Sequence, residues 1–318
     1  MNAPPPDAYI LGIGAVNIDM MGRAAAPLIM EDSNPGVIGM SVGGVTHNIC
    51  ANAAALGAPV QLITALGDDV HADAIRADCA ATGIDLTHAM VVPGHSSSVY
   101  LSLHDCRGEM ALAVSDMRIL QLLTVEYLEQ KRPVLAGAAA IILDAGLPQV
   151  VLEYIFTTYG PSVPVFVDPV SCTYARKLSG SLRGCHTLKP NRYELAEISG
   201  IPDGTDVPAA CARLLERGAR RVVVSLGREG CLSLTAAGGL RAFGKPLDRI
   251  ANATGAGDAF MGGLLYASLA GLSDADALVL ASGVARLALQ DERTFNPNVT
   301  VQAAWDAAGQ GGVRVETL

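Results

Sequence analysis

The sequence lacks the features that mark nucleic-acid-binding, disulfide-bonded and membrane-spanning proteins. It has 22 Lys and Arg residues against 31 Asp and Glu residues, which gives a net charge of −9, and it has no basic run. Its seven cysteines form no Cys-x-x-Cys pair, and no apolar stretch approaches the roughly 18 residues of a membrane span. We therefore expect a cytoplasmic protein from a reducing compartment, with neither nucleic acid nor membrane as a partner.

Several catalytic signatures are absent as well. The chain has no Gly-x-x-x-x-Gly-Lys-Ser/Thr segment, which excludes phosphate binding by a P-loop. Its six histidines form neither a His-x-His nor a His-Glu-x-x-His pattern, and no Gly-x-Ser-x-Gly segment supports a serine nucleophile. An anionic ligand would therefore need another kind of site, such as a helix N-terminus.

What the sequence does contain is the pattern of an α/β protein. Of its 318 residues 50% are hydrophobic, and many of its 34 glycines adjoin apolar runs, as tight strand-to-helix turns require. Strands are predicted at 9–14, 60–65, 139–143, 163–167, 187–189 and 221–225, and helices at 46–56, 69–82, 149–159, 192–199, 207–217, 257–270 and 275–289. This alternation predicts a mostly parallel sheet with helices on both faces and ligands at the carboxyl ends of its strands.

Residues 96–116 depart from this alternation. Ser98–His104 alternates with a period of two, Asp105–Gly108 supplies turn residues, and a second arm follows, which predicts a β-hairpin. Together with parts of 17–42, which are rich in Gly, Pro and small polar residues, the hairpin could form a small sheet that covers a site. A surface hairpin without such a role explains the pattern equally well.

The segment Asn252-Ala-Thr-Gly-Ala-Gly-Asp-Ala-Phe-Met-Gly-Gly carries the strongest chemical signal. Gly255, Ala256 and Gly257 let backbone amides approach an anion, and the following helix adds the positive end of its dipole, roughly half an elementary charge. Such an anion hole suits a phosphoryl group in transfer, and Asp258 beside it could accept the proton of an attacking hydroxyl. Alternatively, Asp258 is only a helix N-cap that follows an ordinary loop.

Three further segments contain candidate ligand-binding residues. Lys189–Glu194 has an Asn and a Glu three residues apart, which could orient Mg²⁺ through its waters or could only cap a helix. Gly12–Asp19 is no dinucleotide fingerprint, because Asn17 occupies the third glycine position. Asp19 of this segment, together with Gly43, Gly44 and Asn48, could hold vicinal hydroxyls. An Asp in such a place is, however, often a solvated turn residue. Ser225–Gly230 follows a strand, so it is either a nucleotide-binding loop or a simple hairpin turn.

Taken together, these segments resemble the PfkB/ribokinase family of carbohydrate kinases. Asn252–Ala259 looks like the C-terminal signature of the family, Gly43–Asn48 like its N-terminal signature and Asn191–Glu194 like its magnesium motif, and the resemblance covers roughly residues 9–300. It implies a ribokinase-like three-layer α/β sandwich over 9–318, with a mostly parallel central sheet and a small β-sheet lid from about 17–42 and 96–116. The implied reaction transfers the γ-phosphate of ATP to a hydroxymethyl group.

The same resemblance implies roles for individual residues. Asp258 is the catalytic base, and the amides of Gly255, Ala256 and Gly257 form the anion hole. The residues implied to bind the substrate are Asn17, Asp19, Ser33, Gly43, Gly44, Asn48, Tyr100 and Asp116. The residues implied to lie near ATP are Lys189, Asn191, Ser225, Gly227, Gly230, Thr254 and Ser282. Mg²⁺ is expected at Asn191 and Glu194 through water, and K⁺ could bind at Asn252, where the wider family usually has an acidic residue.

Within this family the chain is most similar to the kinases that act on pseudouridine. The similarity lies outside the shared signatures, in stretches such as Asp32–Gly36, Val163–Ser171 and His186–Arg192. It implies phosphorylation of the pseudouridine 5′-hydroxyl. The alternatives are a kinase for another nucleoside or sugar (ribose, adenosine or 2-keto-3-deoxygluconate) and a non-catalytic sugar- or nucleoside-binding regulator.

A selective site would have to recognise the one ring position at which pseudouridine and uridine differ. Pseudouridine has a ring N–H where uridine has a C–H, so the site needs a hydrogen-bond acceptor, for which Ser33 is the candidate. Lid sheets of this family often pair, which also implies a homodimer.

Overall fold

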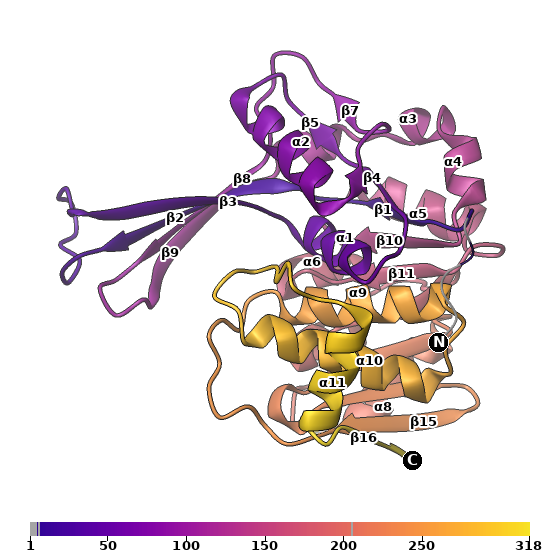
Figure 1. Cartoon of the computed structure of the whole chain (residues 1–318). Coiled ribbons are helices and arrows are strands. Elements are labelled where there is room, and N and C mark those ends of the chain that lie inside the picture. The colour runs from indigo at the N-terminus through magenta and orange to yellow at the C-terminus, as the bar shows by residue number, and fades with distance from the viewer. Residues whose placement is uncertain (1–4, 6, 205) are drawn as a thin grey trace.

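The body of the molecule is built on one large, mostly parallel β-sheet (Figure 1). The computed structural model describes Pro5 and residues 7–204 and 206–318. From one edge to the other, the strands are β16 (Arg314–Thr317), β15 (Gly238–Phe243), β14 (Cys231–Thr235), β13 (Arg221–Ser225), β12 (Cys185–Leu188), β11 (Val165–Asp168), β10 (Ala140–Asp144), β1 (Ile10–Ile13), β4 (Val60–Ile63) and β6 (Ile84–Asp85). The pairs are parallel from β13 to β6 and antiparallel from β13 to β16.

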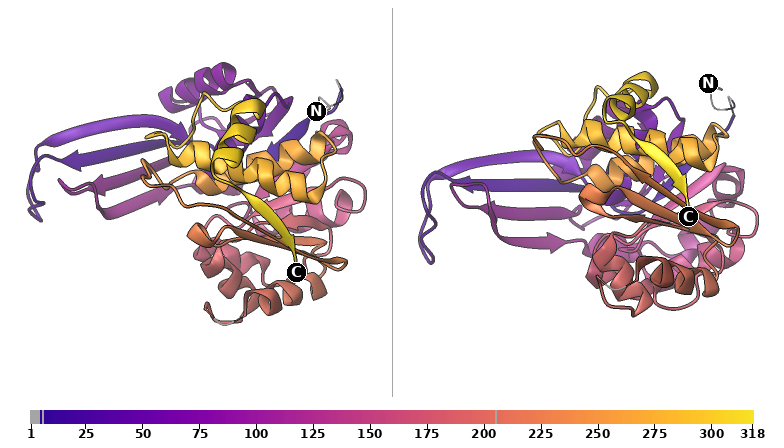
Figure 2. Two further views of the ribbon diagram at one scale, coloured as in Figure 1. Left: turned by 60° about the horizontal axis from the view of Figure 1, so that its bottom comes forward. Right: turned by 90° about the horizontal axis from the view of Figure 1, so that it is seen from below.

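Helices cover both faces of this sheet (Figure 2). One layer contains α1 (Val45–Ala55), α2 (Val70–Thr82), α9 (Ala256–Leu269), α10 (Asp274–Leu289) and α11 (Val301–Gln310). The other contains α3 (Val125–Glu129), α4 (Arg132–Gly137), α5 (Gln149–Thr158), α6 (Cys172–Ala175), α7 (Arg192–Ser199) and α8 (Val207–Glu216). In the part of the chain that the structure describes, no helix is both long and apolar enough to span a bilayer.

The strands read as continuous apolar runs because both of their faces are buried. Successive residues of a strand point to opposite faces. Ile10 and Ile142 therefore enter the core under the first helix layer, whereas Leu11 and Leu143 enter the core under the second. This arrangement confirms the predicted three-layer α/β sandwich with a mostly parallel central sheet.

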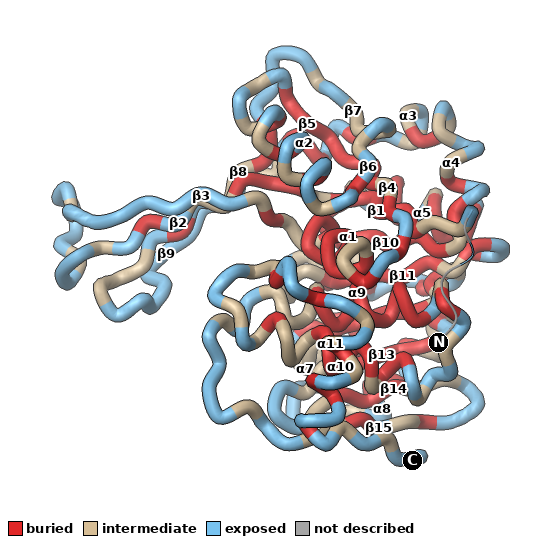
Figure 3. The backbone as a smooth tube through the Cα atoms, in the orientation of Figure 1, coloured by how far each residue is buried: buried red, intermediate tan, exposed pale blue. Residues whose placement is uncertain are grey.

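A second, smaller sheet projects from the body (Figures 1 and 3). Its strand order is β3 (Gly36–Gly43), β2 (Asn17–Ala24), β8 (Val99–His104) and β9 (Met110–Asp116). β8 and β9 form the predicted hairpin, and β2 and β3 come from the glycine-containing segment before α1. A short parallel pair, β5 (Ala65–Leu66) with β7 (Met90–Val91), lies near its root.

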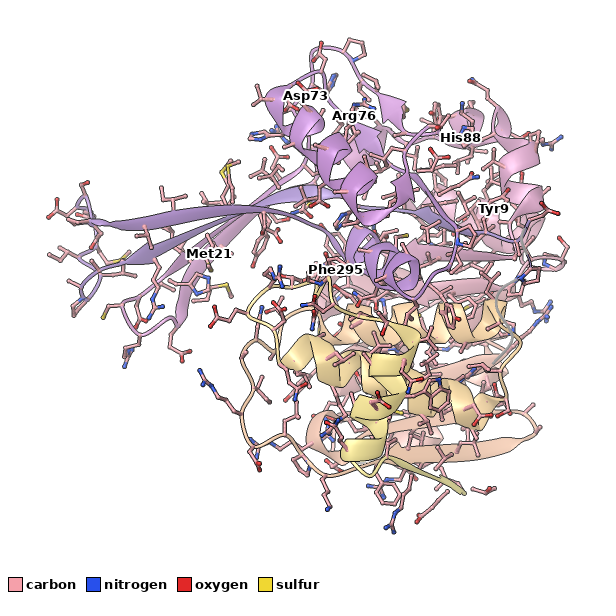
Figure 4. The ribbon with its side chains drawn as sticks, viewed as in Figure 1. Tyr9, Met21, Asp73, Arg76, His88 and Phe295 are labelled. Carbon is pink, nitrogen blue, oxygen red and sulfur yellow. The ribbon has the colours of Figure 1, made fainter. Side chains whose placement is uncertain are left out.

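The two faces of the projecting sheet differ in polarity. Strand register places Asp19, Ser41 and Tyr100 together on one face, which we call the polar face. The opposite face is apolar and largely exposed, with Ile38 at 82% exposure and Val114 at 59%. Figure 4 shows Met21 on the projecting part of β2, and its side chain lies on the polar face.

Candidate active site

The site is built around the N-terminus of α9, at the carboxyl edge of the parallel strands. Several of the described helices have a side-chain N-cap. The N-caps of α2, α10 and α11 are Asp69, Ser273 and Thr300, and the side chain of each accepts a hydrogen bond from a backbone amide of the first turn. The N-cap of α9 is Gly255, with φ of 87° and no side-chain cap. A Cβ there would lie 2.3 Å from the Thr294 carbonyl oxygen, so the position needs glycine. The first-turn amides of α9 are therefore left for an anion.

Asp258 is the third residue of α9, so it is not the N-cap. One of its carboxylate oxygens, Oδ2, accepts a hydrogen bond from Nδ2 of Asn48 at 2.9 Å. Burial, followed by the negative charge of Asp168, raises the pKa of Asp258 to about 7, although Asn48 and Lys189 act in the opposite direction. A carboxylate with a pKa near neutral pH is suited to accept a proton during a reaction.

Close packing of α9 against α1 brings Asn48 and Asp258 together. A Cβ on Gly262 would lie 2.9 Å from the carbonyl oxygen of Ile49, so only glycine lets the two helices approach this closely. Gly263 permits an equally close approach of α9 to α10. The Gly-Gly pair of the motif therefore serves to seat α9 between its two neighbours.

Charged residues follow three adjacent strands at the same edge of the sheet. Asp144 ends β10, Asp168 ends β11 and Lys189 follows β12. Nζ of Lys189 lies 3.2 Å from Oδ2 of Asp168, and both residues are buried. Burial alone would lower the pKa of Lys189, but the carboxylates of Asp168, Glu194 and Asp258 raise it instead. The lysine is thus a buried cation beside the N-terminus of α9.

Asp144 and Asp168 were not predicted as site residues. Asp144 accepts hydrogen bonds from Oγ1 of Thr46 and the amide of Ala15, both at 2.6 Å, and from the amide of Gly146 at 2.8 Å. It therefore ties the loop after β1 to the start of α1. The available signal was that each Asp closes an apolar strand run, which is where ligands bind in such sheets.

Most of the predicted substrate-binding residues form one group with Asp258. Nδ2 of Asn17 donates to Oδ1 of Asp19 at 2.6 Å, and the amide of Asn48 donates to the carbonyl oxygen of Gly44 at 2.8 Å. A Cβ on Gly43 would lie 2.1 Å from Oδ2 of Asp19. Burial raises the pKa of Asp19, opposed by the hydrogen bond from Asn17. Asp19 is therefore a partly buried, hydrogen-bonded carboxylate and not a solvated turn residue.

Three other predicted substrate residues lie on the projecting sheet. Tyr100 pairs in register with Asp19 and shares its face. Ser33 is exposed in the loop between β2 and β3, at the end of the sheet away from Asp19. Asp116 is on the face opposite Asp19, and its Oδ2 forms an ion pair with Nη2 of Arg118 at 2.7 Å. The structure thus brings Tyr100 towards the group and leaves Ser33 and Asp116 apart from it.

A cleft of about 700 Å³ lies next to the N-terminus of α9. The predicted site residues that line it are Asn191, Ser225, Gly227, Gly230, Ala256, Gly257 and Ser282. Ser225–Gly230 is both the turn between β13 and β14 and a wall of the cleft. Arg228 and Lys245 also line it, and neither was predicted. This volume and these cations suit a nucleotide with its phosphates.

The predicted metal-binding residues also hold local structure together. Oδ1 of Asn191 accepts from first-turn amides of α7, and Oε2 of Glu194 accepts from the amide of Asn191 at 2.8 Å. The described residues contain no cluster of three or more His, Cys, Asp or Glu side chains that could hold a metal ion. Oδ1 of Asn252 accepts from the amide of Thr254 at 2.9 Å, and its Nδ2 donates to the carbonyl oxygen of Glu292 at 3.2 Å.

Comparisons with known proteins relate the chain to carbohydrate and nucleoside kinases. Residues 7–301 match the family described as pfkB family carbohydrate kinase. A pseudouridine kinase from Escherichia coli K12 is 36% identical over 296 residues, which cover 92% of this chain and 94% of that protein. A guanosine-inosine kinase from Exiguobacterium acetylicum is 26% identical over 279 residues, 86% of this chain and 91% of the relative. The solved structure of Arabidopsis thaliana ribokinase, complexed with ribose and ATP, has a TM-score of 0.81 at 20% identity and covers 96% of this chain and 99% of that one.

Proposed function

The chain belongs to the pfkB family of carbohydrate kinases and is a sugar or nucleoside kinase, and from this premise we propose that it transfers the γ-phosphate of ATP to the 5′-hydroxyl of pseudouridine. The observation that carries the proposal is the 2.9 Å contact between Asn48 and Asp258, because it joins the hydroxyl-binding group to the anion hole. The pseudouridine kinase relative, similar over nearly the whole chain, supports this substrate.

In the proposed mechanism the substrate lies between the polar face of the projecting sheet and the N-terminus of α9. Asp19, Asn17 and Asn48 hold the sugar hydroxyls, which leaves the hydroxymethyl group next to Asp258. Asp258 accepts the proton of that hydroxyl as its oxygen attacks. The free amides at Ala256 and Gly257 stabilise the charge on the transferring phosphoryl group.

The cleft beside α9 is proposed to hold ATP. Arg228 and Lys245 supply positive charge there, and the buried Lys189 adjoins Gly257. Bound Mg²⁺ would neutralise phosphate charge, and Glu194 could reach its water ligands. Asn252 could contribute its Oδ1 to K⁺, which a comparison of rates in K⁺ and tetramethylammonium salts would test.

The substrate proposal is tested by ADP release. Pseudouridine, uridine, ribose, adenosine and guanosine are supplied in parallel at equal concentration. We expect the highest kcat/KM with pseudouridine. Faster turnover of guanosine or ribose would change the substrate assignment but leave the kinase assignment intact. If no acceptor raises ADP release above the rate of ATP hydrolysis measured without an acceptor, a non-catalytic binding protein would be favoured.

We also propose that the projecting sheet closes over bound substrate. Its polar face carries Asp19 and Tyr100, and closure would exclude water, which otherwise competes for the phosphoryl group. Hydrogen exchange of residues 96–116 should slow at saturating nucleoside. Unchanged exchange would favour a surface hairpin without this role.

A second copy of the chain is the proposed partner of the apolar face of the same sheet. Its exposed members are Ile38, Met40, Leu101, Leu103, Leu112 and Val114. Monomeric proteins rarely expose a contiguous apolar patch of this kind. Light scattering should give the mass of two chains for the wild type and of one chain for Met40→Glu. A monomeric wild type at micromolar concentration would remove this proposal.

A further inference from the structure

A buried histidine connects the proposed catalytic base to a carboxylate on the neighbouring helix α2. His47 is the third residue of α1 and is 2% exposed. Its Nε2 lies 2.9 Å from Oδ2 of Asp78 on α2, and its Nδ1 lies 3.3 Å from Oδ1 of Asn48. Because Nδ2 of Asn48 in turn donates to Asp258, three successive contacts link Asp78 to the base. Sequence analysis included His47 in the Gly43–Asn48 segment but gave it no role.

The hydrogen-bond directions show what charge His47 must carry. The amide nitrogen of Asn48 faces the carboxylate of Asp258, so its Oδ1 is the atom left to face His47, and that atom can only accept. The carboxylate of Asp78 is also an acceptor. His47 satisfies both neighbours only when both ring nitrogens carry a proton, which is the imidazolium form.

The ionisable groups beside His47 are acidic. Asp78 from α2 is in contact with its Nε2, and the charge on His47 opposes the burial that raises the pKa of Asp19 on β2. The ring therefore lies beside two carboxylates, of which Asp19 holds the sugar in the proposed mechanism.

We propose that His47 is a positioning residue whose cationic ring orients Asn48, and through Asn48 the catalytic base. This inference rests on the proposed function of Asp258. When the ring is neutral, its remaining N–H stays with the carboxylate of Asp78, and the lone pair on Nδ1 then faces the lone pairs on Oδ1 of Asn48. That repulsion turns the amide away and removes the donor from Asp258.

Two substitutions separate this role from a purely structural one. His47→Asn puts an amide donor near the position of Nδ1 and abandons Asp78, whereas His47→Gln reaches Asp78 and abandons Asn48. We expect His47→Asn to retain kcat/KM within about threefold at neutral pH and His47→Gln to lower it roughly tenfold, the cost of one hydrogen bond to a charged or polar partner. If His47 only tethers α1 to α2, the order reverses, with His47→Gln the more active and the more heat-stable variant.

The split between kcat and KM gives a second readout that a tether would not change. We expect His47→Gln to lower kcat more than it raises KM, because Asn48 then no longer holds the catalytic base in place. His186→Gln is the matched control, since His186 is partly buried in β12 and bonds to Thr187. Its kcat and KM should match the wild type. An unchanged kcat in His47→Gln would overturn the proposal.

A measurement without turnover keeps the inference separate from the kinase assignment. In protein labelled with ¹⁵N-histidine, the His47 ring, assigned by its loss in His47→Asn, should show two protonated nitrogens at neutral pH. A neutral His47 ring at a pH of full activity would disprove the positioning role even if Asp258 is the base. Conversely, if Asp258→Asn leaves turnover intact, the proposed mechanism fails whatever the charge on His47.

Discussion

The N-terminus of α9 and the projecting sheet form the two halves of the proposed site, and they differ in how firmly the chain holds them. Lys189 and Asp168 beside α9 are at most 5% exposed and form an ion pair, and α9 packs tightly between two helices. No helix among the described residues covers the outer part of the projecting sheet (Figure 3). Met21 there is 49% exposed and Ile38 is 82% exposed. One half is packed into the core, and the other projects from it.

This difference suggests that chemistry and selectivity have separate structural origins. Phosphoryl transfer needs groups fixed to fractions of an ångström, which buried elements provide. Substrate choice can change by altering a few exposed residues on a sheet that carries little of the core. Substitutions in the first half should therefore affect all substrates alike, whereas those in the second should affect the choice among them.

The largest expected effect tests the buried half. Asp258→Asn keeps the shape of the side chain but removes the proton acceptor, so kcat should fall by roughly 10²–10⁴-fold with every accepted substrate. Asp276→Asn is the matched control, because Asp276 is also the third residue of its helix and bonds only locally to Ser273. Near wild-type turnover of Asp258→Asn would remove Asp258 from the mechanism.

The next largest effect concerns the cap of α9. Gly255→Ala introduces a Cβ at a left-handed backbone position, 2.3 Å from the Thr294 carbonyl oxygen, so the first turn must shift. Displaced anion-hole amides should lower kcat by about 10²-fold. In Gly271→Ala the backbone is equally left-handed, with φ of 66°, but no atom lies within 4 Å of the new Cβ. An equal decrease in kcat in both variants would show that backbone strain, and not displacement of the anion-hole amides, causes the loss of activity.

Local patterns in the sequence were sufficient to predict the strands and the glycine-rich turn of the buried half. The parallel strands are apolar runs, and the glycine-rich turn before Asp258 is contiguous, so both can be recognised without knowing the fold. The hairpin of β8 and β9 was predicted for the same reason, because its alternation is local. The antiparallel strands β14, β15 and β16 and helix α11 were not predicted from the sequence.

The contacts between distant segments could not be predicted. Asn48 meets Asp258 across 210 positions, and Thr46 meets Asp144 across 98, so each contact depends on how the layers pack. The ring of His47 is informative only once Asp78 and Asn48 are seen on its two sides. Ser33 was chosen because its segment resembles the pseudouridine kinases, lies in the expected lid and offers oxygen acceptors, but the sequence does not show that it lies at the free end of a projecting sheet.

A smaller effect should appear in the acid branch of the pH profile, which belongs to the buried half. Because the base must be ionised and its pKa is raised to about 7, kcat/KM should fall as pH drops below this value, by about tenfold per unit. The carboxylate of Asp168 contributes to raising that pKa, so Asp168→Asn should move the acid branch to lower pH. Substitutions confined to the projecting sheet, such as Ser33→Ala, should leave it in place. An acid branch that moves with the nucleoside instead of with Asp168 would contradict this assignment.

The smallest effect compares the root of the projecting sheet with its tip. Ser41 lies opposite Asp19 on the polar face and is exposed, so its hydroxyl can accept the extra ring N–H of pseudouridine. Ser33 lies in the loop beyond Ala24, which is about 16 Å along β2 from Asp19 at the usual rise per residue. Ser41→Ala should reduce the preference for pseudouridine over uridine roughly fivefold, which corresponds to about 1 kcal/mol, whereas Ser33→Ala should change it less than about twofold. Competition between the two nucleosides measures both ratios directly. If Ser33→Ala removes the preference and Ser41→Ala does not, the tip must reach the site in the working enzyme, and the projecting sheet would then be as much a part of the closed site as α9.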